Sequence, residues 1–203
     1  RGLGDVYKRQ DFYEALVQRP LPAQAVYEEV RKRGGIVINT HPLMPRHTLH
    51  WMGATEAWSD AVTGHSADLF DVDAGHTELL WFAQLNLGSQ IGVSGHTDAA
   101  LGRTRTATPG DNRVYCRADR QDYDVFVEAM RAGKTMTTNG GTVFAFLEVD
   151  GQGPGAELQP STEVTAKLMI ESLKPLQSAG IYLNGERVAA FNVNGQTGPL
   201  EFE

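Results

Sequence analysis

The stretch from Ile91 to Asp98, IGVSGHTD, joins a short apolar run to residues that can carry chemistry. Ile91 and Val93 suit a buried β-strand, and Gly95 allows the backbone to turn sharply where that strand ends. His96 and Asp98 are therefore predicted to follow the carboxyl end of a strand. In α/β folds, active sites are assembled at this edge of the sheet.

A second stretch repeats this design upstream. A helical pattern ends in Arg31-Lys32-Arg33-Gly34, the apolar run IVINT follows at residues 36–40, and His41 comes next. Basic residues and glycine are typical of a helix C-terminus, and the apolar run is typical of a buried parallel strand. We predict that His41 meets His96 and Asp98 at one metal site.

The intervening segments alternate between helix and strand patterns. Residues 59–75 are polar without a clear period and are predicted to form a loop that could serve as a lid. Further elements are predicted as a helix at 77–87, a strand at 114–117, a helix at 122–132 and a strand at 134–138. The sum of about four strands and three helices predicts roughly half of a (β/α) barrel.

The pattern changes beyond Gly141. The remaining segments alternate apolar and polar residues, and Asn-Gly pairs stand at 184–185 and 194–195. Asn-Gly between alternating runs is a strong signal for a β-hairpin turn. We predict a small antiparallel, β-sandwich-like domain at 141–203, after a partial α/β domain at 11–140.

Composition excludes several classes of protein. The chain has 203 residues, 41% of them hydrophobic and 21% charged, as in ordinary globular proteins. A net charge of -7 argues against a nucleic-acid surface, which needs a basic face. The single cysteine, Cys116, excludes an internal disulfide and a thiolate metal cage. No apolar run approaches the ~20 residues that span a bilayer.

The first ten residues, RGLGDVYKRQ, resemble a translated adapter sequence, and we expect residues 1–10 to be non-native. The sequence also stops at Glu203 within a strand-like pattern. We therefore expect the chain to be a fragment that lacks sequence at both ends.

The candidate site has the atom types of a hydrolytic metal centre. Imidazole nitrogens of His41 and His96 and the carboxylate of Asp98 are ligands for Zn, Mn or Fe. A bound metal lowers the pKa of water and supplies hydroxide as the nucleophile. The alternative is structural: a histidine at a strand end bonds a backbone carbonyl, and an aspartate caps the next turn.

Two arginines are candidates for substrate binding. Arg103 and Arg113 lie in or next to a predicted loop after the Asp98 segment, and a guanidinium group can hold an anion by forked hydrogen bonds. The alternative is that both are solvated charges that balance the acidic segment 60–75.

Several motifs together resemble one known family. GGIVINTHP, LNLGSQIGVSGHTD, NRVYCRA and FVEAMRAGKTMTTNGG occur in an order similar to that in CehA/McbA-like metallohydrolases of the PHP (polymerase and histidinol phosphatase) superfamily. The likeness covers about residues 25 to 160. It implies the C-terminal half of a distorted (β/α) barrel of PHP type with metal ligands at the strand ends, followed by a β domain.

The resemblance also implies site residues and an activity. His41 matches a metal histidine and Asp98 a late metal aspartate, whereas His96 matches a position that is usually small. The family hydrolyses phosphoesters or carbamate esters. Here Asp98 is followed by Ala99 and Ala100, where many members have Asp-x-His, so one ligand is absent. The family's opening histidine cluster and middle glutamate would precede residue 11.

Two functions follow as expectations. The first is a metal-dependent hydrolase of small-molecule phosphoester or carboxylic or carbamate ester substrates, of which this fragment alone is inactive. The second is a non-catalytic scaffold of the same type, whose β domain binds carbohydrate or a partner. The two differ in metal stoichiometry.

Overall fold

The computed structural model describes residues 23–40, 67–72, 77–97, 99, 108–159 and 161–203. The chain divides into two compact units, residues 1–35 and residues 36–203. The described part of the first unit contains helix α2, Ala23–Lys32, whose last turn carries Arg31 and Lys32. Gly34 follows with φ +77°, and the Gly35 N–H donates to the Val30 carbonyl at 2.9 Å. This confirms the predicted helix and its glycine stop.

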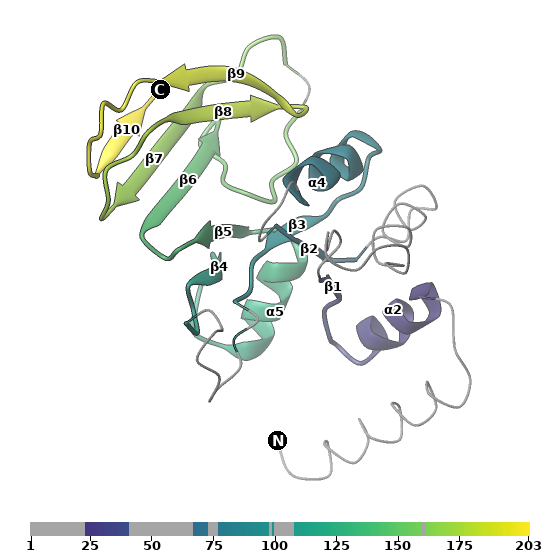
Figure 1. Ribbon diagram of the computed structural model, residues 1–203. Helices are drawn as coiled ribbons and strands as arrows, with labels where there is room; N and C mark the ends of the chain where they lie inside the picture. The colour runs from purple at the N-terminus through teal and green to yellow at the C-terminus, as the bar shows by residue number, and fades with distance from the viewer. Residues whose placement is uncertain (1–22, 41–66, 73–76, 98, 100–107, 160) are drawn as a thin grey trace, which may run out of the picture. The chain divides into compact units, whose positions relative to one another are not determined.

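The second unit begins with a parallel sheet whose strand order is β1-β2-β3 (Figure 1). Its strands are β1, Ile38–Asn39; β2, Leu69–Asp71; and β3, Gly92–Ser94. The parallel pairing agrees with the predicted strands at 36–40 and 91–94. The predicted burial of the first strand is wrong at Ile38, which is 38% exposed.

Strand β2 corrects the loop predicted at 59–75. Leu69 and Phe70 have no exposed surface, and Phe70 packs with Ala67 and Ile91 in the core of this sheet. Burying one such side chain stabilises the fold by roughly 1.5–3 kcal/mol. A strand of three residues is too short to show an alternation of apolar and polar side chains in the sequence, so only its tertiary packing identifies it.

Helix α4, Thr77–Asn86, covers this core. Leu80 and Trp81 pack against it, and the Trp81 indole N–H donates to the Ile91 carbonyl at 2.9 Å. The helix ends where Gly88 adopts φ +88° and the Ser89 N–H donates to the Gln84 carbonyl. The helix predicted at 77–87 and its glycine stop are confirmed.

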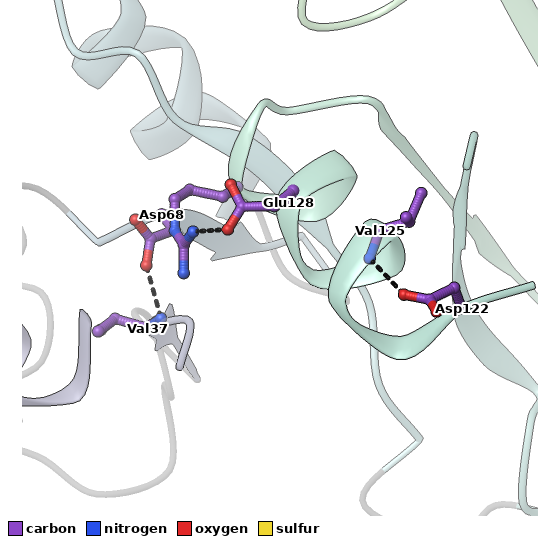
Figure 2. A network of polar contacts seen from close by, with 6 residues as sticks. Val37, Asp68, Asp122, Val125 and Glu128 are labelled. Carbon is purple, nitrogen blue, oxygen red and sulfur yellow. Dashed lines mark hydrogen bonds and ion pairs between the residues drawn. The ribbon is translucent and has the colours of Figure 1, made fainter. Parts of the chain in front are cut away.

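Strands β4 and β5 differ from the predicted barrel in direction. Strand β4, Asn112–Cys116, and β5, Thr135–Asn139, pair antiparallel, although helix α5, Tyr123–Arg131, lies between them in the chain. Asp122 caps α5 by accepting hydrogen bonds from the Asp124 and Val125 N–H groups. Figure 2 shows the bond from Val125. The segments were predicted correctly, but alternating helices and strands do not specify strand direction.

The remaining strands form an antiparallel sheet and a hairpin. The sheet has the order β10-β7-β6 and consists of β6, Val143–Val149; β7, Ala166–Ser172; and β10, Leu200–Phe202. The hairpin joins β8, Ala179–Leu183, to β9, Glu186–Phe191. At its turn Asn184 and Gly185 have φ 54° and 83°, which confirms the predicted Asn-Gly turn. Phe191 stacks on Phe202 with ring centroids 4.4 Å apart and joins the hairpin to the sheet.

The described residues therefore form a mixed α/β fold that consists mostly of strands in several small sheets, and they close no barrel. The domain boundary near residue 141 stays a prediction. Among the helices that the structure describes, none is both long and apolar enough to cross a membrane.

Candidate functional site

The candidate site lies at the carboxyl edge of the parallel sheet. Asp71 ends β2 and is paired in register with Ser94, which ends β3. The Val72 N–H donates to the Ser94 carbonyl at 2.9 Å, so the two strands stay paired to their ends. His96 follows two residues later, and its Nδ1 contacts Oδ2 of Asp71. Residues 25 positions apart in the chain are thus brought together.

Burial differs between the two partners. The Asp71 side chain is 1% exposed, whereas that of His96 is 29% exposed. A buried carboxylate against one ring nitrogen fixes the orientation of an imidazole. The arrangement can therefore present the rest of the ring to a ligand in a defined direction.

Close packing holds the chain between β3 and His96. Gly95 does not have a positive φ, so the sharp turn predicted there does not explain why this position holds a glycine. A Cβ there would overlap the Thr137 hydroxyl and lie 3.4 Å from the Arg113 carbonyl oxygen. The Thr137 hydroxyl itself donates to that carbonyl at 3.2 Å. A side chain at position 95 would push the His96 segment away from β4 and β5.

Thr97 joins the His96 segment to the turn that precedes β4 and to the start of that strand. Its hydroxyl donates to the Asn112 carbonyl at 2.8 Å and accepts the Gly110 N–H at 3.0 Å. The Nε of Arg113 donates to the Gly110 carbonyl at 2.5 Å. The structure thus places Arg113 near the start of β4, next to a turn that is hydrogen-bonded to the neighbour of His96.

Three predicted site residues, His41, Asp98 and Arg103, lie outside the described residues. Asp71 was missed as a site residue because its segment was predicted to be a loop. The sequence held a signal for it: Leu69-Phe70 followed by Asp71 is a short apolar run that ends in a ligand-type residue, as in the stretch at Ile91.

The donor set fits a metal ion in part. Asp71 and His96 supply a carboxylate oxygen and an imidazole nitrogen, which Zn, Mn and Fe accept. Within the described ranges no group of three or more histidine, cysteine, aspartate or glutamate side chains could hold a metal. A metal ion here would need further ligands from outside the described ranges, and in the sequence His41 follows the end of β1 by two residues.

Comparisons with protein-family models, with curated proteins and with solved structures find no match for this chain.

Proposed function

We propose that the carboxyl edge of the sheet β1-β2-β3 belongs to the centre of a metal-dependent hydrolase of the CehA/McbA-like type. The substrates would be small molecules with phosphoester, carboxylic ester or carbamate ester bonds. The observation that carries the proposal is the contact between Asp71 and His96. It unites a buried carboxylate with a partly exposed imidazole at the sheet edge where α/β enzymes assemble their sites.

Each residue has a distinct part in this proposal. Asp71 would hold the His96 ring through Nδ1, so that Nε2 of His96, together with His41 and Asp98, would hold the metal. When bound, a divalent metal acts as a Lewis acid and makes water more acidic at neutral pH. Arg113, held through its Nε, would use its terminal nitrogens to bind the anionic or carbonyl oxygen of the substrate.

Metal content tests this proposal directly, without requiring turnover. The chain would be loaded with Zn, Mn or Fe in turn, desalted and measured by elemental analysis. We expect about one metal ion per chain, and a loss of most of it in His96→Ala and Asp71→Asn. Asp119→Asn serves as the matched control because Asp119 is exposed. Circular dichroism would establish that each variant folds.

A bound metal also predicts a shift in melting temperature. A ligand at a free concentration of 100 times its Kd stabilises the folded state by about 2.7 kcal/mol, so a chelator should lower the Tm of the loaded chain. Metal content that is the same in both site variants and in the control would contradict the proposed ligands. No bound metal, together with a Tm unchanged by chelator, would favour the non-catalytic scaffold that binds carbohydrate or a partner.

A further inference from the structure

A groove of about 810 Å³ lies between strands β4 and β5 and one face of the sheet β10-β7-β6. Its volume falls in the range of small-molecule sites, roughly 300–1,000 Å³. Its walls combine aromatic rings with charged side chains of both signs. None of these residues takes part in the contact between Asp71 and His96.

One end of the groove already holds a cation on an aromatic ring. The guanidinium carbon of Arg117 lies 5.6 Å from the centroid of the Phe146 ring, and the Arg117 Nη1 lies 3.8 Å from the Glu148 carboxylate. Lys134 is at this end too, because the Arg117 N–H donates to its carbonyl at 2.9 Å. The two residues that line the groove with cationic side chains, Arg117 and Lys134, are therefore paired through their backbones at this end.

The other end has the same combination of an aromatic ring and a carboxylate, but among the described residues no lysine or arginine lines it. Phe144 and Glu171 are directly opposite each other on β6 and β7, so their side chains share one face of the sheet. Tyr115 meets Phe144 edge to face, with centroids 5.4 Å apart and planes at 81°. Phe144 is 38% exposed, and no described residue forms an ion pair with Glu171.

We propose that this end of the groove, formed by Tyr115, Phe144 and Glu171, binds a small organic cation of the alkylammonium or quaternary ammonium class. The negative faces of the rings attract the cation, and the Glu171 carboxylate neutralises its charge. Arg117 performs the same role within the chain at Phe146 and Glu148. The rest of the groove accommodates the apolar part of the ligand.

Choline and its neutral isostere 3,3-dimethyl-1-butanol test the proposal, because they have nearly the same shape and differ in charge. The labelled chain would be titrated with each and followed by amide NMR shifts, with sodium chloride as the control for ionic strength. We expect choline to bind about five-fold more tightly than the alcohol and to shift the amides around Phe144 and Glu171.

Variants identify the groups responsible. We expect Glu171→Gln and Phe144→Leu each to weaken choline binding about five-fold and to leave binding of the alcohol unchanged. Glu201→Gln is the matched control, since Glu201 lines the same groove but is paired with the Lys167 ammonium at 2.7 Å. Equal binding of the two probes, or full choline affinity in Glu171→Gln, would overturn the proposal. Neither result depends on metal binding at His96.

Discussion

Gly92→Ala should destabilise the protein, although removing a glycine from a strand normally has the opposite effect. A Cβ at position 92 would lie 2.7 Å from Leu69 Cδ2, 2.8 Å from Gly133 Cα and 3.1 Å from Thr135 Oγ1, whereas ordinary contacts begin at 3.4 Å. The overlaps are thus 0.7, 0.6 and 0.3 Å. The Leu69 methyl can move within the core, but Gly133 Cα is backbone, and moving it would displace the end of α5.

Two opposing effects on the free energy of unfolding decide whether Gly92→Ala stabilises or destabilises the protein. Replacing glycine by alanine stabilises a protein by about 0.4–1 kcal/mol when the native backbone accepts it. Inserting a methyl into a packed core costs about 1–3 kcal/mol. Because two of the three contacts fall below 3.0 Å, the steric cost should dominate. We expect a net loss of about 1–2 kcal/mol in the free energy of unfolding, measured by urea denaturation at constant m.

A double-mutant cycle isolates the cause. Leu69→Ala alone should cost about 2–5 kcal/mol because Leu69 is fully buried. Combined with Gly92→Ala, the cost should fall below the sum by about 0.5 kcal/mol or more, since the new methyl occupies part of the vacated space. Ile170→Val in the sheet β10-β7-β6 should instead add to Gly92→Ala within about 0.5 kcal/mol. A stabilised Gly92→Ala, or strict additivity with Leu69→Ala, would refute the packing of β3 between β2 and β5.

Three further predictions concern single groups. Asp68→Ala should lower the free energy of unfolding by about 1–3 kcal/mol, because it removes the carboxylate that accepts the Val37 N–H at 2.7 Å (Figure 2). An effect within about 0.5 kcal/mol, as expected for substitution of an exposed residue such as Asp119, would contradict this prediction. Asp122→Ala should lower the free energy of unfolding by about 1 kcal/mol because the N-cap of α5 is lost, whereas Asp122→Ser should keep most of that stability in the same denaturation assay. Equal stability of the two variants would argue against capping by Asp122. Burial raises the pKa of the Cys116 thiol above its ordinary value, and Lys134 opposes the shift. Iodoacetamide should therefore alkylate the folded chain along a pH profile displaced to higher pH than that of the urea-unfolded chain. The folded state disfavours the thiolate, so stability should fall as pH rises through the pKa of the thiol in the unfolded chain. Coincident alkylation profiles would contradict the burial of Cys116.

Local chemistry sufficed to predict many elements of this chain. Some features depend only on residues within a few positions of one another. They are the helix stops at Gly34 and Gly88, the Asp122 cap and the Asn184-Gly185 turn. Each is a choice of backbone conformation that neighbouring residues make together, so the sequence alone determined it. The two helices α4 and α5 were predicted for the same reason.

Contacts between segments that are distant in the sequence could be identified only from the tertiary structure. Strand β2 has only three residues and becomes a strand because Leu69 and Phe70 are buried between β1 and β3. The antiparallel direction of β4 and β5, and the contact of His96 with Asp71, likewise arise between segments that no local pattern links. The free energy that selects these arrangements comes from burying surfaces far apart in the chain, and only the folded structure shows which surfaces meet.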